Sequence, residues 1–298
     1  MTELVQLTFG GLGLGVVYAL VALGFVVVYR ASQVFNFAQG ELLAFGAFAM
    51  TSLAAAGVPW IAAVLGAMAA TGLVAAGCER LVLRRMIGRP VFVTIILTIF
   101  IGFVLRALVV IVWGTDPRGV PTPWDTTAVL ELGEARVLWN TVAAEIAAAV
   151  ALAALALFSR YSRLGVAMRA TSDDQEVSLA LGIPVGRVFG ASWFVAGALA
   201  ALAGVFLGMF PRTVDSNLGF VALRAFPAVI VGGLDSPVGT VIAALSLGVL
   251  EVLTQGYVNE RLGQFGHGFH AVLPYLVMIL FLMVRPYGLL GRRQVERV

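Results

Sequence analysis

The hydrophobic pattern of this chain consists of long apolar stretches separated by short polar ones. A helix needs about 20 apolar residues to cross a bilayer, and eight stretches are near that length. They run near residues 5–29, 37–56, 60–77, 91–113, 139–158, 190–210, 238–257 and 270–284. The pattern therefore predicts an all-α, polytopic membrane bundle, formed as a single domain over residues 1–298.

A further apolar stretch, residues 218–233, is too short for a comfortable crossing and too apolar for a loop. It ends at Gly232 and Gly233, shortly before Pro237. Irregular structure at membrane depth is tolerated only where it packs against protein or lines a cavity. We therefore expect a short tilted or broken helix here, and eight or nine transmembrane segments in total.

A polar segment, residues 160–187, separates two of the apolar stretches. Its residues change from acidic to apolar and then to helix-breaking: Asp173, Asp174, Glu176, Leu179, Gly182 and Pro184. Negative charge early in a helix and Gly or Pro at its end are typical start and stop signals. The segment therefore predicts one short amphipathic helix that ends at Gly182 and offers a docking surface on one side of the membrane.

The placement of arginine orients the predicted spans. Thirteen arginines fall at alternate ends of successive spans: Arg30, Arg80, Arg84, Arg85, Arg89, Arg160, Arg163, Arg169, Arg187, Arg285, Arg292, Arg293 and Arg297. Loops rich in arginine stay in the cytoplasm, which places the N-terminus outside and the C-terminus inside. The opposite loops hold Arg118, Arg136, Arg212 and Arg261, with Arg224 assigned to the same side. Termini on opposite sides require an odd number of crossings, and counting 218–233 as one gives nine.

The composition agrees with a membrane protein and narrows its chemistry. The chain is 60% hydrophobic and 12% charged, whereas a soluble domain carries about 25% charged residues. Its net charge of +3 lies in loops near the membrane, which suits contact with the lipid bilayer rather than with nucleic acid. The 19 residues counted as Lys or Arg are all Arg, and a P-loop needs Lys on the nucleotide phosphates. Any ATP that drives this protein must therefore bind to another subunit.

Few residues indicate catalysis or metal binding. Cys78 is the single cysteine, which excludes an internal disulfide and a multi-cysteine metal site. His267 and His270 lie in a Gly-rich loop, and no carboxylate or cysteine beside them completes a zinc shell. We therefore expect no catalytic residue, metal or cofactor in this chain, and we do not expect an enzyme.

Four ionisable residues lie inside the apolar stretches, where charge is costly: Glu41, Arg106, Glu145 and Glu251. For Arg106 and Glu145 two interpretations stay open. Each belongs to a polar pathway or a buried ion pair, or each lies near a helix end and extends to the membrane surface. Glu41 differs because it ends a polar group that also contains Asn36 and Gln39. These three are candidate residues of a substrate pathway.

Small residues recur at a spacing that suits helix packing, as in Gly11-x-x-x-Gly15 and Gly204-x-x-x-Gly208. In lipid, such pairs let helix backbones approach one another closely. We therefore expect tight helix contacts at both places.

Four segments, in the same order along the chain, resemble segments of one family. Residues 34–47, with Asn36-Phe-Ala-Gln-Gly-Glu41, resemble the Asn-Phe-Ala-His-Gly-Glu signature of permeases in branched-chain amino acid ABC importers of the LivH type. Residues 11–24 resemble the sequence just before that signature. Residues 168–188 and 232–248 resemble the family's cytoplasmic loop and its C-terminal glycine block. Gln39 departs from the family, in which histidine is common at this position.

The resemblance implies a membrane subunit of an ATP-driven amino-acid importer in the bacterial inner membrane. A second, related permease would pair with it, two ATPase subunits would bind ATP and Mg²⁺ below it, and a periplasmic substrate-binding protein would dock above it. The segment 160–187 becomes the cytoplasmic coupling loop, whose movement would drive alternating access. The expected contacts with the ATPase are Asp173, Asp174, Glu176, Leu179 and Gly182.

Three alternatives to an amino-acid importer stay open. Permeases for urea and short-chain amides resemble the same family. A secondary transporter driven by an ion gradient would need carboxylates inside the membrane, for which Glu41, Glu145 and Glu251 are candidates. An intramembrane enzyme is the least supported, because no acid, base or metal set is recognisable.

Overall fold

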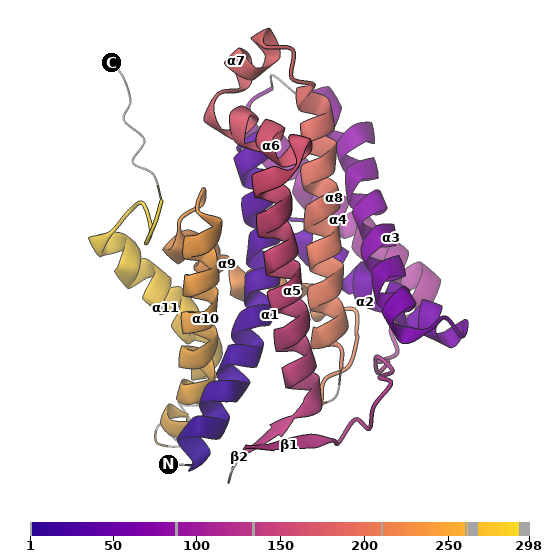
Figure 1. Ribbon diagram of the computed structural model, residues 1–298, viewed down its shortest axis with the longest axis vertical. Helices are drawn as coiled ribbons and strands as arrows, with labels where there is room; N and C mark the ends of the chain where they lie inside the picture. The colour runs from indigo at the N-terminus through magenta and orange to yellow at the C-terminus, as the bar shows by residue number, and fades with distance from the viewer. Residues whose placement is uncertain are drawn as a thin grey trace.

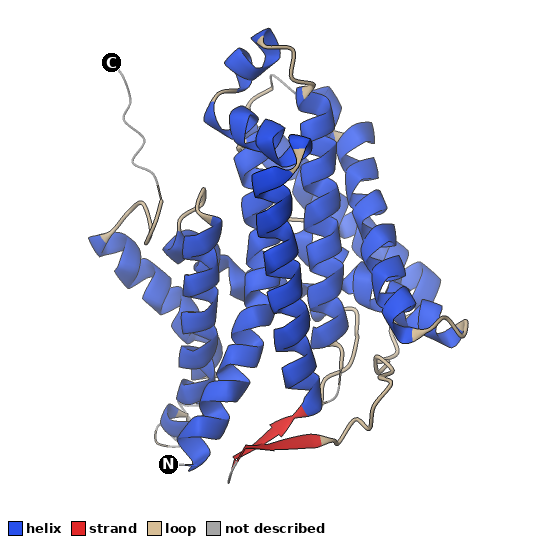
Figure 2. Ribbon diagram, in the orientation of Figure 1, coloured by secondary structure: helices blue, strands red, loops and turns tan. Residues whose placement is uncertain are grey.

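The computed structural model describes residues 2–86, 89–132, 135–209, 211–259, 261 and 268–291. This described part is a helical bundle, which confirms the predicted fold class (Figure 1; Figure 2). It contains six helices that are long and apolar enough to cross a membrane: α1 (Thr2–Ser32), α3 (Trp60–Leu81), α4 (Val91–Trp113), α5 (Trp139–Tyr161), α8 (Val185–Leu207) and α10 (Pro237–Leu253). Shorter apolar helices complete it: α2 (Gln39–Ala55), α9 (Val221–Gly232) and α11 (Phe269–Val284). Single turns extend three helices: η1 (Leu83–Met86), η2 (Leu218–Phe220) and the π-helical η3 (Thr254–Val258).

The bundle has two opposite ends. At the first, which we call the α6 end, lie α6 (Arg163–Asp173) and α7 (Gln175–Ala180) (Figure 1). At the second, which we call the hairpin end, lie the start of α1 and the strands β1 (Val129–Leu132) and β2 (Ala135–Leu138). The long helices run between these two ends.

The β-hairpin is an element that the hydrophobic pattern did not predict. Its strands pair antiparallel, with Val129 opposite Leu138. Four-residue strands are too short for their alternation to be told from a loop sequence. Before the hairpin, Asp125 accepts hydrogen bonds from the backbone N–H and the hydroxyl of Thr127, and these bonds hold the pKa of the Asp125 carboxyl below its usual range.

The helix α2 begins inside the bundle rather than at one of its ends. Residues 33–38 turn back from the α6 end as irregular backbone, starting at Gln33, whose φ of 56° is left-handed. The side chain of Gln39 then donates to the carbonyl of Ala196, which is the middle residue of α8. The apolar stretch expected at 37–56 is therefore a helix that starts near half depth.

The helix α9 is the short helix expected from residues 218–233. The 3₁₀ turn η2 leads into it, and Pro227 lies within it. η2 packs against the start of α2, where a Cβ at Gly40 would overlap the carbonyl of Gly219. Two helices therefore start at the same depth, in contact with each other, and the prediction of a short or broken helix is confirmed.

The helices form two halves, α1 to α4 and α8 to α11 (Figure 1). Each helix of the first half runs in the opposite direction to its counterpart in the second. α3 packs on α8 as α10 packs on α1, and α1 packs on α8 between them. α2 contacts α3 and α4, as α9 contacts α10 and α11. In both halves the second helix is the one that starts inside the bundle. Inverted repeats of this kind are common in transport proteins, where the two repeats enclose the site.

Close approach of small residues joins α1 to α10. A Cβ at Gly11 would lie 2.6 Å from the Cα of Val249, and a Cβ at Gly15 would lie 2.8 Å from the Cα of Leu245. In lipid, helices associate through such van der Waals contact, because lipid tails are as apolar as the side chains. The expected packing role of this glycine pair is therefore confirmed.

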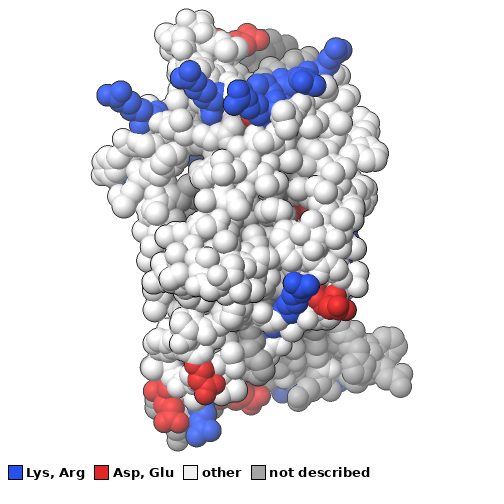
Figure 3. Space-filling model, turned by 90° about the vertical axis from the view of Figure 1, so that its right-hand side faces the viewer, with Lys and Arg blue, Asp and Glu red and all other residues white. Residues whose placement is uncertain are grey.

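Charged side chains are concentrated away from the middle of the surface. On the face shown in Figure 3, basic side chains form a belt near the α6 end, and a broad band below the belt carries few charges. Exposed apolar side chains of α4, among them Phe100, Phe103 and Ile111, are what lipid tails require. The surface is therefore that of a protein embedded in a bilayer.

Candidate functional site

The start of α2 is held by a buried polar network around Asn36 and Gln39. The side chain of Asn36 donates to Gln39 Oε1 at 3.2 Å and accepts from the backbone N–H of Ala38 at 3.1 Å. Gln39 donates to the carbonyl of Ala196 on α8 at 3.1 Å. Both side chains are fully buried. Because buried polar groups need such partners, Asn36 and Gln39 fix the point at which α2 begins.

Glu41 faces a different set of side chains, which come from α4 and from the chain that leads into α9. Its Oε1 lies 3.7 Å from Nη1 of Arg106. Arg106 Nη2 donates to Asn217 Oδ1 at 2.8 Å, and the guanidinium lies 4.6 Å from the centre of the Phe220 ring. We call Glu41, Arg106, Asn217 and Phe220 the Glu41 cluster. Both α2 and α9 begin beside it.

The Glu41 cluster holds charges of both signs inside the bundle. The side chains of Glu41 and Arg106 are 15% and 27% exposed, so neither is fully buried. Glu41 Oε2 is buried and has no hydrogen-bond partner among the described residues. A buried acceptor without a partner is costly, so this oxygen is available to a donor on a ligand. The nearby helix starts favour negative charge from a ligand.

A second ion pair, between a half-exposed arginine and a buried glutamate, joins α9 to α10. Arg224 Nη1 lies 3.7 Å from Glu251 Oε1, and the hydroxyl of Tyr18 on α1 donates to Glu251 Oε2 at 2.8 Å. Glu251 is almost fully buried. The arginine pattern assigned Arg224 to an outside loop, and this assignment is wrong. Arg224 lies in the first turn of α9, which begins inside the bundle.

The open question about ionisable residues is settled for Arg106, and Glu145 is a different case. Arg106 forms an ion pair rather than extending freely to the membrane surface. Glu145 packs beside Gly13 of α1, and its buried Oε1 has no hydrogen-bond partner among the described residues. Sequence reasoning missed Asn217, because a polar residue directly before a short apolar stretch indicates a helix start but not the side chain that it contacts.

The polar segment 160–187 contains two helices where one was predicted. Asp173 is the last residue of α6, and Asp174 lies between α6 and α7. The Asp174 side chain accepts a hydrogen bond from the backbone N–H of Val177 at 3.0 Å. This is an N-cap, which starts a new helix in a new direction. Gly182, with a left-handed φ of 79°, follows the end of α7.

The helix α7 presents apolar side chains to the outside. Val177, Leu179 and Leu181 are all more than half exposed, and Glu176 lies in the first turn beside them. α7 projects beyond the rest of the bundle in Figure 1. Exposed apolar residues gathered on a projecting element are typical of protein–protein contact. All five expected ATPase contacts, Asp173, Asp174, Glu176, Leu179 and Gly182, are exposed, and Leu179 is the large apolar side chain among them.

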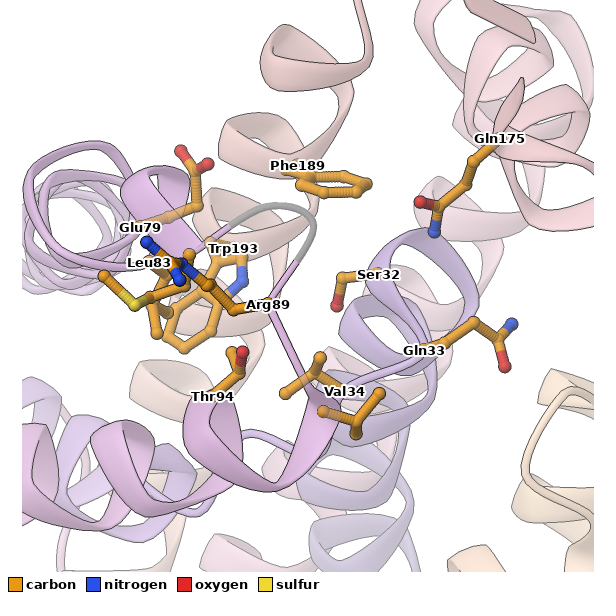
Figure 4. Close-up of a pocket in the computed structure, with 12 residues that line it drawn as sticks. Ser32, Gln33, Val34, Glu79, Leu83, Arg89, Thr94, Gln175, Phe189 and Trp193 are labelled. Carbon is orange, nitrogen blue, oxygen red and sulfur yellow. The ribbon is translucent and has the colours of Figure 1, made fainter. Parts of the chain in front are cut away.

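A cavity of about 330 Å³ lies below α7 at the α6 end. Figure 4 shows Gln175 and Gln33 on one side of it and Glu79 and Trp193 on the other. Gln175 Nε2 also donates to the carbonyl of Ala31, near the end of α1, at 3.3 Å. α7 is thereby joined to the residues that lead back to the start of α2.

The described residues contain no group of three or more His, Cys, Asp or Glu side chains that could hold a metal ion. His270 Nδ1 lies 2.8 Å from Asn259 Nδ2. His267 lies outside the described residues.

Almost the whole chain matches one family of known proteins. Residues 7–282 match the family described as branched-chain amino acid transport system / permease component. The chain is 31% identical to the high-affinity branched-chain amino acid transport system permease protein LivH of Salmonella typhimurium, over 98% of this chain and 97% of that protein. It is 30% identical to the permease protein BraD of the same kind of system in Pseudomonas aeruginosa, over 97% of this chain and 96% of that protein.

The fold also has a counterpart among solved structures. A chain in the structure of PsaBC from Streptococcus pneumoniae in complex with Fab matches with a TM-score of 0.50 and 12% sequence identity, covering 95% of this chain and 91% of that chain. This likeness concerns the fold alone. The family match, in contrast, spans the Glu41 cluster, α6 and α7. This chain therefore belongs to the family of permease components of branched-chain amino acid transport systems.

Proposed function

We propose that this chain is a membrane subunit of an ATP-driven importer and that it carries branched-chain amino acids by alternating access. Membership of the family supports a transport role, and the names of LivH and BraD support the substrate. The Glu41 cluster is the observation that carries the proposal. It presents both signs of charge at the depth where two helices begin, and an amino-acid zwitterion needs both.

Glu41 and Arg106 receive the charged ends of the substrate. Glu41 Oε2, which has no partner among the described residues, accepts the ammonium group. Arg106, held in place by Asn217, binds the carboxylate, because a guanidinium can offer two parallel N–H groups to it. Asn36 and Gln39 are positioning residues, since they fix the start of α2 on which Glu41 lies.

Energy enters through ATPase subunits that bind α7 within the coupling loop 160–187. The chain has no lysine and therefore no P-loop, so ATP and Mg²⁺ bind to the ATPases. Leu179 docks into them, with Glu176 beside it. Asp173, Asp174 and Gly182 shape the two-helix loop that presents α7. The bond from Gln175 to Ala31 transmits movement of α7 to α1 and to the start of α2.

The complete transporter contains further subunits around this single permease domain. A second, homologous permease pairs with it, and a substrate-binding protein docks at the hairpin end. The α6 end, where Arg30, Arg80 and Arg160 lie in the last turns of α1, α3 and α5, faces the cytoplasm by the positive-inside rule. The N-terminus then lies outside the inner membrane of a bacterium.

Uptake by the reconstituted transporter tests this proposal. The chain is placed in liposomes with its partner permease, ATPases and substrate-binding protein, and uptake of labelled leucine is measured with and without ATP. We expect uptake only with ATP. Glu41→Gln and Arg106→Gln should each lower the rate by at least about tenfold, which corresponds to the loss of roughly 1.4 kcal/mol of binding in the transport cycle. Arg85→Gln, at an exposed position of η1 outside the Glu41 cluster, the hairpin and α7, is the matched control and should leave the rate unchanged.

Two results would contradict the proposal in different ways. Uptake of leucine by the chain without ATPases would identify a secondary transporter. Preference for urea or acetamide over leucine would identify an amide permease, because these uncharged substrates do not need a carboxylate and a guanidinium to bind them. Competition by isovalerate and isopentylamine separates these cases further, because each lacks one end of the zwitterion and should compete poorly with leucine.

A further inference from the structure

An open groove lies beside α6, between α1, α5 and α10. Its volume is about 490 Å³. The three helices stand next to one another in Figure 1, with α6 across the ends of α1 and α5. Most of the groove is apolar, with walls formed by Leu23, Val27, Leu152, Leu155, Val241 and Ile242. Ile242 is 48% exposed, so the groove is open to the surroundings of the bundle.

Arginine side chains line the groove where it meets α6. Arg30 belongs to the last turn of α1, Arg160 to the last turn of α5, and Arg169 to α6. None of the described residues that line the groove is Asp or Glu. Arg169 donates to the backbone carbonyls of Ser159 and Arg160, and Arg160 lies 5.4 Å from the centre of the Tyr161 ring. These contacts do not neutralise the positive charge of Arg160 or Arg169.

The apolar walls extend from the arginines towards the middle of the bilayer. Leu23 precedes Arg30 by seven residues, and Leu152 precedes Arg160 by eight. This spacing corresponds to roughly 10–12 Å along a helix. The groove therefore offers positive charge at the level of lipid headgroups and apolar surface at the level of acyl chains.

We propose that this groove binds an anionic glycerophospholipid, with the phosphate against Arg160 and Arg169 and an acyl chain along α1, α5 and α10. Guanidinium groups bind phosphate through paired N–H groups. Basic pockets between membrane helices at this level suit anionic headgroups. A zwitterionic lipid binds less well, because its cationic group finds no carboxylate among the lining residues.

Native mass spectrometry of the full chain, purified in detergent, tests the proposal. The protein is titrated with dioleoyl phosphatidylglycerol and with dioleoyl phosphatidylcholine, which differ only in the headgroup. We expect the anionic lipid to be retained at least about fivefold better, as an arginine contact at the membrane surface provides. Arg160→Gln should remove most of this preference. Arg163 is exposed, lies three residues further along the chain and does not line the groove, so Arg163→Gln should preserve the preference for the anionic lipid.

A second pair of variants tests the acyl-chain part of the groove. Ala156→Phe fills the groove from α5 and should lower retention of phosphatidylglycerol, whereas Ala154→Phe changes an exposed residue of the same helix outside the groove. Inorganic phosphate at millimolar concentration should not displace the lipid. The proposal fails if both lipids are retained equally, if Arg163→Gln acts like Arg160→Gln, if Ala156→Phe has no effect, or if phosphate alone displaces the lipid.

Discussion

Glu41 and Arg106 stabilise the bundle as a pair. Either charge would destabilise the bundle if the other were removed. Asn217 and the Phe220 ring hold the guanidinium from the α9 side, so α2, α4 and the chain before α9 meet at one point. Breaking a fully buried ion pair costs about 3–5 kcal/mol, because one charge is left without compensation. Here the side chains are 15% and 27% exposed, so water lowers that cost.

We therefore predict that Glu41→Gln or Arg106→Gln lowers the free energy of unfolding by about 1–3 kcal/mol. The double variant should lose less than the sum of the two single losses, because it leaves no uncompensated charge. Thermal unfolding in detergent, arranged as a double-mutant cycle, measures this coupling. The hairpin pair Arg136–Glu131, with side chains 72% and 65% exposed, is the control and should couple by less than about 1 kcal/mol. Strictly additive losses at Glu41 and Arg106 would show that the two side chains do not interact.

The residues of this cluster were predictable only in part. Glu41 and Arg106 stand out in the sequence because charge is costly within an apolar stretch. Asn217 does not, because asparagine is common in the turns that precede helices. Its role depends on the approach of η2 to α4, more than a hundred residues earlier in the chain, and no local pattern encodes that approach.

At the level of elements, the contact between α1 and α10 depends on the missing side chain of Gly15. We predict that Gly15→Ala lowers the free energy of unfolding by about 1–3 kcal/mol, because the new Cβ would lie 2.8 Å from the backbone of Leu245. Gly77→Ala on α3 is the matched control, since no atom lies within 4 Å of its added Cβ. Alanine favours a helix over glycine, so this control should be neutral or stabilising by up to about 1 kcal/mol. Equal melting temperatures for the two variants would contradict the tight contact.

The docking proposed for α7 can be tested separately from the folding of α7. Asp174→Ala would remove an N-cap, at a cost of about 1 kcal/mol, and would confuse the two effects. The Leu179 side chain is exposed, and the carbonyl that accepts a hydrogen bond from Gly182 belongs to the backbone. Leu179→Asp should therefore leave the melting temperature unchanged. We predict that it prevents the ATPase subunits from co-purifying with the chain. Val166→Asp, at an exposed apolar position of α6, is the control; if it alone releases the ATPases, they dock on α6 instead.

The sequence predicts which stretches are helices better than it predicts where those helices lie in depth. The length of an apolar stretch is a local property, and it identified α2 and α9. Their starting depth depends on contacts with residues far away in the chain, such as Ala196 for α2. Local capping also divided the polar segment: the side chain of Asp174 starts a second helix where composition alone indicated one.

For the whole molecule, the two inverted halves place a charged side chain at equivalent positions. Glu41 lies in the first turn of α2 and Arg224 in the first turn of α9, and these helices occupy the same place in their halves. Each charge pairs with a helix of its own half, Glu41 with α4 and Arg224 with α10. A relative movement of the halves therefore leaves both ion pairs intact and changes the contact between η2 and α2.

The same arrangement puts the described termini at opposite ends of the bundle, which cysteine labelling can test. Cys78 is the single cysteine, so Cys78→Ala gives a background that does not react with maleimide. Single cysteines are then placed at exposed positions of the hairpin end, Leu4→Cys and Val129→Cys, and of the α6 end, Leu179→Cys and Leu290→Cys. Each variant is treated, in spheroplasts, with a maleimide that does not cross membranes.

We predict that Leu4→Cys and Val129→Cys react at once, and that Leu179→Cys and Leu290→Cys react only after the membrane is lysed. The reason is that loops rich in arginine stay on the cytoplasmic side, and the belt of arginines lies at the α6 end. The reverse pattern would keep the fold but invert the orientation, and α7 could then not meet an ATPase in the cytoplasm. Labelling of Leu4→Cys and Leu290→Cys from the same side would contradict an odd number of crossings, and with it the prediction that residues 218–233 form a ninth crossing.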